Sequence, residues 1–206
     1  DSGRIESITF EDSENADLVL SGVVVPGVPN IHSHAHQKLI AGLAEFRVPE
    51  KDNFWGWREL MYKANANLNP DQMYTIACYL YATMLEQGYT SVTEFHYLHH
   101  QINGQRYSNC AEFSASILSA ASDVGIAITL MPAFYCRGGF RNEPVSDIQK
   151  RFVNDSDSYL EILQSCCDMC LGNPNQSVGF AAHSLRAVEP TKISSYLLSP
   201  VPAGIL

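Results

Sequence analysis

Apolar strand-like runs alternate with helix-like segments along most of this chain, and that order constrains the fold more than any other feature. The strands expected after the first apolar steps, Val23–Val25 and Val28–Ile31, are Tyr89–His96, Ile126–Phe134 and Ser177–Ala182. The helices expected are Phe54–Leu68, Pro70–Gln87, Cys110–Val124, Asp155–Leu171 and Pro190–Leu198, with a shorter helix or irregular arm over Gln37–Phe46. Strand–helix alternation predicts an α/β fold with a parallel sheet and right-handed crossovers.

Four such βα units make half of a (β/α)8 barrel, which needs about 250 residues. We therefore predict a partial (β/α)8 (TIM-type) barrel over residues 23–206. Residues 1–22 are predicted to form a small β-unit, with strands at Arg4–Phe10 and Leu18–Leu20 and a turn at Glu11–Asn15. The chain also lacks an initiator Met, which favours a longer parent protein.

Histidines follow three of the four expected strands, at the edge where α/β barrels carry their chemistry. His32 and His34 are two residues apart on an extended segment, so their side chains point to the same face about 7 Å apart. Two neutral imidazoles can share one Zn, Fe or Ni ion. An accidental pair of surface histidines is the alternative. His36 is either a third ligand or part of the following loop or helix.

The composition narrows the class of partner. The net charge is −9, so nucleic acid and anionic membranes are excluded as expected partners, whereas a small anionic molecule would need a local cation. The sequence contains no run of 18 apolar residues, so no membrane span is predicted, and the acidic N-terminus is not a signal peptide. Cys167 and Cys170 fall within a helical pattern, which favours buried thiols of a cytoplasmic protein over a metal site.

Several long blocks of this sequence resemble the amidohydrolase superfamily of metal-dependent hydrolases, and within it the formimidoylglutamate deiminase family. The blocks are PGVPNIHSHAHQKLIAGLAE from Pro26, FWGWRELMY from Phe54, EQGYTSVTEFHYLHH from Glu86, RFVND from Arg151 and HSLRAV from His183. The resemblance implies a small β-sandwich, here reduced to residues 1–22, beside a barrel with one zinc ion. It also implies hydrolysis of N-formimino-L-glutamate to N-formyl-L-glutamate and ammonia, a step of histidine degradation.

The resemblance implies a role for six residues of this chain. His32 and His34 correspond to metal ligands, and Gln37, Tyr97, His183 and Arg186 fall on the substrate side. A guanidinium can pair bidentately with a carboxylate, while amide and phenol groups can orient polar atoms. A surface salt bridge is the alternative for Arg186, and a structural hydrogen bond is the alternative for His183. A homodimer is left open.

The sequence also departs from the family pattern. Ala182 stands where the family usually has Pro, and His36 where it has Phe. The family's remaining metal histidine, the acid/base Glu that follows it, and its late His and Asp have no counterpart, so the catalytic residues are expected beyond Leu206. Glu94 is a weak substitute, and this chain alone is expected to be inactive. The alternatives are a related deaminase or chlorohydrolase acting on a heterocycle, and an inactive truncated product.

Overall fold

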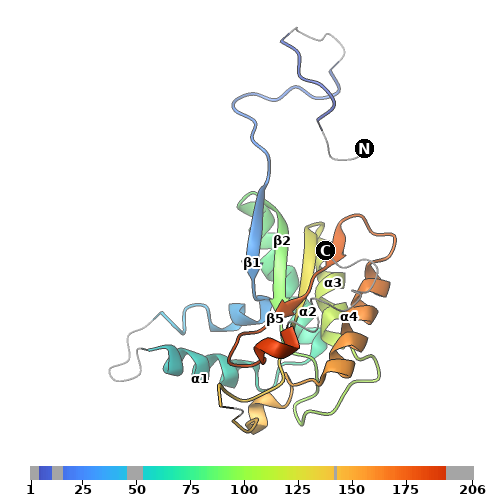
Figure 1. Cartoon of the computed structure of the whole chain (residues 1–206). Coiled ribbons are helices and arrows are strands. Elements are labelled where there is room, and N and C mark those ends of the chain that lie inside the picture. Colours follow the sequence, from blue (N-terminus) through green and yellow to red (C-terminus); the bar gives the residue numbers. More distant parts are fainter. Residues whose placement is uncertain (1–4, 11–15, 46–52, 142, 194–206) are drawn as a thin grey trace.

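The computed structural model describes residues 5–10, 16–45, 53–141 and 143–193. Its centre is a parallel sheet with strands in the order β1-β2-β3-β4. These strands are β1 (Val28–Ser33), β2 (Tyr89–His96), β3 (Ala127–Phe134) and β4 (Gln176–Val178), and a short β5 (Ala181–Ala182) also pairs in parallel with β3. Figure 1 shows the strands side by side, as the strand–helix alternation predicts.

Helices connect successive strands and cover the sheet. The main helices are α1 (Phe54–Asn65), α2 (Pro70–Glu86), α3 (Glu112–Val124) and α4 (Ser156–Cys170). Two short 3-10 helices are η1 (Ala35–Ile40) and η2 (Asp147–Gln149). Residues 190–193 are helical, whereas the rest of the helix expected to Leu198 and the remaining residues to Leu206 lie outside the described residues. In Figure 1, α1 lies beyond the ends of the strands, whereas α2, α3 and α4 lie beside the sheet.

Local capping explains why the helices begin and end where they do. Asn69 accepts a hydrogen bond from the Gln72 backbone N–H, and the Gln72 side chain accepts one from the Asn69 N–H, so the two close a capping box. Asn53 caps α1, and Asp155 caps α4. Gly125 ends α3 with a φ of 87°, a left-handed conformation that glycine adopts without strain.

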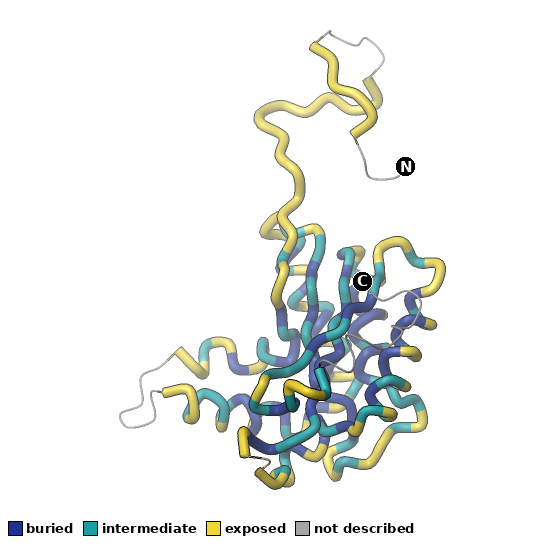
Figure 2. The backbone as a smooth tube through the Cα atoms, viewed as in Figure 1, coloured by how far each residue is buried: buried dark blue, intermediate teal, exposed yellow. Residues whose placement is uncertain are grey.

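The core lies between the sheet and α2, α3 and α4 (Figure 2). β3 buries Ile128 and Leu130, and it half-buries the alternating Thr129 and Met131. Both faces of this strand are therefore covered, as its continuous apolar sequence indicates. The six cysteines are free thiols, and those of α4 are buried in this core. None of the described helices is long and apolar enough to cross a membrane.

The N-terminal segment differs from its prediction. Residues 5–10 and 16–22 form no strand, and the turn expected at Glu11–Asn15 lies outside the described residues. Val23–Val25 also stays outside the sheet, with Val23 92% exposed, and β1 begins only at Val28. Strands persist where backbone partners and an apolar face are available, and the described part of this segment runs away from the sheet (Figures 1 and 2). The division of domains at residue 22 stays a prediction.

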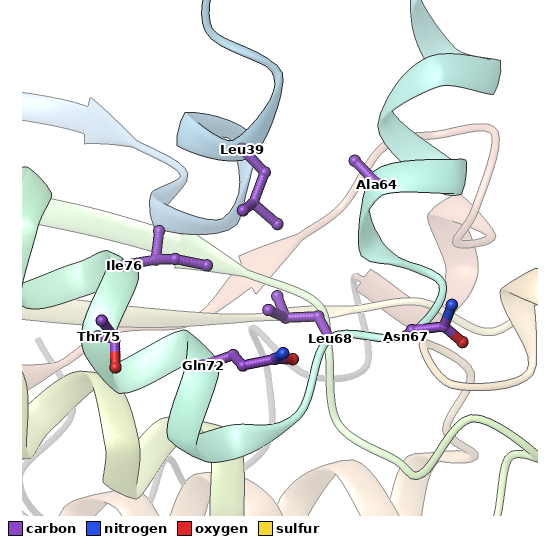
Figure 3. A pocket seen from close by; sticks show the side chains of 7 residues that line it. All are labelled: Leu39, Ala64, Asn67, Leu68, Gln72, Thr75 and Ile76. Carbon is purple, nitrogen blue, oxygen red and sulfur yellow. The ribbon is translucent and has the colours of Figure 1, made fainter.

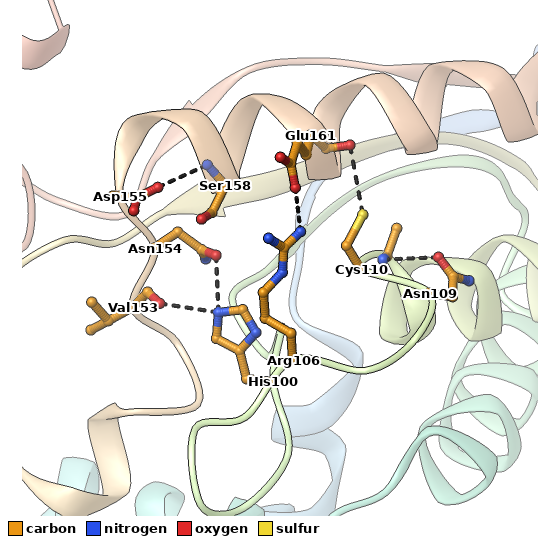
Figure 4. A network of polar contacts seen from close by, with 10 residues as sticks. His100, Arg106, Asn109, Cys110, Val153, Asn154, Asp155, Ser158 and Glu161 are labelled. Carbon is orange, nitrogen blue, oxygen red and sulfur yellow. Dashed lines mark hydrogen bonds and ion pairs between the residues drawn. The ribbon is translucent and has the colours of Figure 1, made fainter.

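The long loop after β2 is fastened to α4 by polar contacts (Figure 4). His100 Nε2 lies 2.9 Å from Asn154 Oδ1 and 3.1 Å from the Val153 carbonyl oxygen. Arg106 forms an ion pair with Glu161 on α4. These contacts hold the carboxyl-terminal end of β2 next to the RFVND block.

Candidate functional site

A cavity of about 460 Å³ opens at the carboxyl ends of the strands. All six residues singled out in the sequence line it, although they come from segments far apart in the chain. Its lining is His32, His34, Gln37, Phe54, Trp57, Arg58, Met61, Tyr62, Phe95, Tyr97, Ala133, Ala182, His183, Ser184 and Arg186. The parallel sheet brings these segments together because its strands end at one edge.

The two histidines of β1 and its end converge at one wall of this cavity. His32 Nε2 and His34 Nε2 are 3.0 Å apart. His34 Nδ1 lies 2.8 Å from the Phe95 carbonyl oxygen, to which it donates a hydrogen bond. That bond leaves the lone pair on His34 Nε2, the nitrogen facing His32. Burial lowers the pKa of His34, the Phe95 carbonyl raises it and His32 lowers it, so the ring favours the neutral form that binds metal.

This donor pair fits a metal ion. Two imidazole nitrogens that each lie about 2.0 Å from one zinc ion are about 3 Å apart, close to the separation seen here. Within residues 5–10, 16–45, 53–141 and 143–193, no group of three or more His, Cys, Asp or Glu side chains could hold a metal. His32 and His34 could thus supply two of the four ligands that zinc usually has.

His36 lies outside the cavity lining. The alternation of faces ends when the chain enters η1, which turns His36 into the interior beside Tyr97, with ring centroids 4.8 Å apart. Its side chain is fully buried, and neither ring nitrogen has a hydrogen-bond partner among the described residues. Burial and the neighbouring His34 lower its pKa to about 3. The geometry favours a buried neutral ring over a third ligand.

Tyr97 and His183 line the cavity beside the histidine pair, with the Tyr97 and His34 ring centroids 6.1 Å apart. The Tyr97 and His183 rings meet edge to face with centroids 4.8 Å apart, and the Tyr97 hydroxyl lies 3.3 Å from Met61 Sδ. Burial, followed by the positive charge of Arg186, lowers the pKa of His183 to about 3, so this ring is neutral at pH 7. His183 Nδ1 contacts the Ser184 hydroxyl at 3.2 Å, which leaves Nε2 available to a ligand.

Two guanidinium groups line the cavity, and sequence reasoning identified only one of them. Arg186 lies over the Phe54 ring at 5.6 Å, and no described residue forms an ion pair with it, which disfavours the surface salt bridge. Arg58 lies on α1, 5.0 Å from the Trp55 ring and 5.2 Å from the Tyr62 ring.

Arg58 could have been found from helical spacing. It occupies the stripe of α1 that contains Phe54, Trp57 and Met61, all of which line the cavity. A charged residue inside the apolar stripe of a helix is unusual, which marks Arg58 as a candidate functional residue. The two tryptophans of this helix differ: Trp55 is 62% exposed, whereas Trp57 is half-buried, packs against the core and lines the cavity.

Arg137, which follows β3, fixes the loop that carries Arg186. Its guanidinium donates to the Arg186 carbonyl at 3.0 Å and to the Leu185 carbonyl at 2.6 Å. It also lies 3.5 Å from the Glu189 carboxylate. Arg186 thus points into the cavity from an ordered loop.

A second cavity of about 390 Å³ lies between η1, α1 and α2 (Figure 3). Its lining contains no titratable or metal-binding side chain and consists of Leu39, Ala64, Asn67, Leu68, Gln72, Thr75 and Ile76. Of these two cavities, the first is the one lined by titratable and metal-binding side chains.

Comparison with known proteins shows what the whole described chain is similar to. The chain is 49% identical over 178 residues to a curated formimidoylglutamate deiminase of Pseudomonas aeruginosa, a match that covers 86% of this chain and 39% of the relative. No family model matches.

Solved structures show the same architecture. An amidohydrolase from Brucella melitensis superposes with a TM-score of 0.79 and 43% identity, over 83% of this chain and 38% of that one. A triazine hydrolase variant, at 16% identity and a TM-score of 0.63 over 81% of this chain and 36% of that one, shows the fold alone. The chain spans about two fifths of the length of the first two relatives. On the blocks that carry the match and the parallel α/β fold that they form, this chain is similar over most of its length to a formimidoylglutamate deiminase and to an amidohydrolase of solved structure.

Proposed function

We propose that this chain supplies the metal-binding and substrate-binding portion of a zinc-dependent hydrolase that converts N-formimino-L-glutamate and water to N-formyl-L-glutamate and ammonia. One observation carries the proposal: a pair of facing imidazoles and two guanidinium groups line the same cavity. The similarity to a formimidoylglutamate deiminase supports the choice of substrate. The activity is proposed for the whole protein, because this chain matches only 39% of the length of its relative.

His32 and His34 would hold the zinc ion through their Nε2 atoms, and Phe95 would keep the His34 ring oriented. When bound, zinc supplies Lewis acidity, which lowers the pKa of a water molecule toward about 7. The substrate has two carboxylates, and Arg186 and Arg58 provide two cations for them. Gln37 offers an amide and Tyr97 a hydroxyl from the same lining, so two polar groups are available to orient the formimino group.

Proton transfer needs a group with a suitable pKa within hydrogen-bond reach of the reacting atoms. No carboxylate belongs to the described lining of the cavity. The Glu94 carboxyl is fully buried outside it, so it is a poor candidate for that role. His183 offers an uncharged ring nitrogen that can donate or accept one hydrogen bond from substrate. We propose that the acid/base residue lies beyond Leu206, in the part of the whole protein that relatives possess outside this match.

Metal binding and carboxylate recognition can be tested on this chain. Native mass spectrometry should find one zinc per chain, lost in His34→Ala. Calorimetry of the zinc-loaded chain with the unreactive product N-formyl-L-glutamate should show binding weakened about 10-fold or more in Arg186→Ala and Arg58→Ala, because each removes a charge-assisted contact. Arg141→Ala, an exposed arginine outside the cavity, is the matched control. Equal affinity in wild type and Arg186→Ala would contradict the proposal and favour a heterocyclic substrate without carboxylates.

A further inference from the structure

Glu94 is a buried carboxyl group that the proposed chemistry does not use. It lies on β2 opposite Ser33 in the parallel register, and its side chain is fully buried. Its neighbours are the Ser33 hydroxyl and the Tyr81 hydroxyl of α2, so it lies between the sheet and the helices rather than in the cavity. Burial raises its pKa to about 7, against the lowering effect of the Ala35 amide and the two hydroxyls. A carboxyl kept in such surroundings needs a structural or functional reason.

The geometry supplies that reason. Glu94 Oε1 accepts a hydrogen bond from the backbone N–H of Ala35 at 2.5 Å. Ala35 follows His34 directly and is the first residue of η1, and the residue before η1 provides no side-chain cap. Glu94 therefore satisfies an N–H at the start of η1 from a neighbouring strand.

The next residue of β2 completes a second contact. The Phe95 carbonyl accepts from His34 Nδ1, while the Glu94 side chain holds the peptide that follows His34. Two successive residues of β2 thus fix both the ring and the backbone of His34. The β1–β2 register is irregular between Asn30 and Ser33, just before this point, so the strand pairing alone does not set the direction of the imidazole.

We propose that Glu94 is a positioning residue that holds the Ala35 peptide and thereby keeps His34 Nε2 directed at the ion shared with His32. This inference rests on the proposed function for its metal. In this role Glu94 accepts a hydrogen bond from the Ala35 N–H and transfers no proton to or from the substrate. Residues that orient metal ligands typically change metal affinity by about 10- to 100-fold when they are removed.

Zinc affinity of four variants, measured by competition with a chromophoric chelator, tests the proposal. Glu94→Ala should bind zinc at least about 10-fold more weakly than wild type. Glu94→Gln keeps an oxygen at the same reach and should stay within about 3-fold, while Glu94→Asp keeps the charge but falls one methylene short and should behave like Glu94→Ala. Val92→Ala, a buried β2 residue on the same face, controls for loss of stability and should leave zinc affinity unchanged.

The amide proton of Ala35 provides a readout that needs no metal. In 1H–15N spectra of the metal-free chain it should resonate far downfield in wild type and Glu94→Gln, and move upfield in Glu94→Asp and Glu94→Ala. Wild-type affinity in a folded Glu94→Ala or Glu94→Asp would overturn the proposal, and so would a loss in Glu94→Gln equal to that in Glu94→Asp. If Glu94→Ala does not fold, Glu94→Asp decides. Failure of wild type to bind zinc would instead refute the proposed function, while the Ala35 amide would still test the contact.

Discussion

Arg151 places a guanidinium in the interior without a carboxylate partner among the described residues. Its side chain is 1% exposed, and it donates to main-chain carbonyls of Asn65 at 2.6 Å, Ala66 at 3.1 Å and Leu68 at 2.7 Å. These carbonyls lie at the carboxyl end of α1 and in the turn to α2, where the helix dipole favours a cation. Arg151 thus anchors the helix whose other end lines the cavity, which gives the RFVND block a structural role.

Replacing Arg151 should cost far more stability than replacing an exposed arginine. Arg151→Ala leaves several buried carbonyls without donors, so the free energy of unfolding should fall by about 3 kcal/mol. Arg106→Ala is the matched control, because it removes an exposed ion pair with Glu161 and should cost less than about 1 kcal/mol. Urea unfolding followed by circular dichroism measures both. Similar losses in the two variants would show that the buried bonds of Arg151 contribute little.

At the scale of the element, α2 begins at a capping box that belongs entirely to local sequence. Asn69→Ala removes the acceptor for the Gln72 N–H and should lower the free energy of unfolding by about 1 kcal/mol. Asn69→Asp keeps an oxygen at the same position and should stay within about 0.5 kcal/mol of wild type. Thermal or urea unfolding of the two variants provides the measurement, and an equal loss in both would argue against the side-chain oxygen as the stabilising group.

This kind of local signal explains which elements the sequence could predict. The bounds of β2 and the start of α2 agree with expectation because glycine, proline and capping residues act over a few positions. The first strand differs because Val23–Val25 has β propensity but no partner strand in the described structure. Periodicity places His32 and His34 on one face, but it does not show that η1 turns His36 inward.

The cavity could be predicted to the extent that it depends on the order of strands. Parallel strands share an edge, so the residues after β1, β2 and β5 had to meet there. Arg58 enters from α1, whose position depends on tertiary contacts such as those of Arg151. Helical spacing marks Arg58 as a charge within the apolar stripe of α1, but it does not show that this stripe lines the cavity. That depends on contacts such as the one between Arg151 and Asn65, which are 86 positions apart.

At the scale of the whole molecule, several buried histidines couple stability to pH. His36, His96, His99 and His183 are held neutral, since burial is the first cause that lowers each pKa. The pKa of His99 falls to about 4, although its Nε2 donates to the Ala133 carbonyl at 3.1 Å. In an unfolded chain the same ring would have a pKa of about 6.5. The unfolded state therefore binds more protons than the folded state between these two values.

The metal-free chain should consequently lose stability as the pH falls from about 6.5 towards 4, and keep it above 6.5, where both states hold neutral histidines. His99 alone should contribute roughly 3 kcal/mol over that interval, because each pKa unit is worth about 1.4 kcal/mol. The amide of His99→Gln can still donate to the Ala133 carbonyl. In this variant the slope of unfolding free energy against pH should decrease by up to about 1.4 kcal/mol per pH unit, which corresponds to one proton. Val92→Ala should lower stability at every pH and keep the wild-type slope. Urea titrations at pH 5.0, 5.5, 6.0 and 6.5 in the presence of a chelator measure these slopes. A slope in His99→Gln equal to that of wild type would show that His99 is not responsible for the loss of stability in acid.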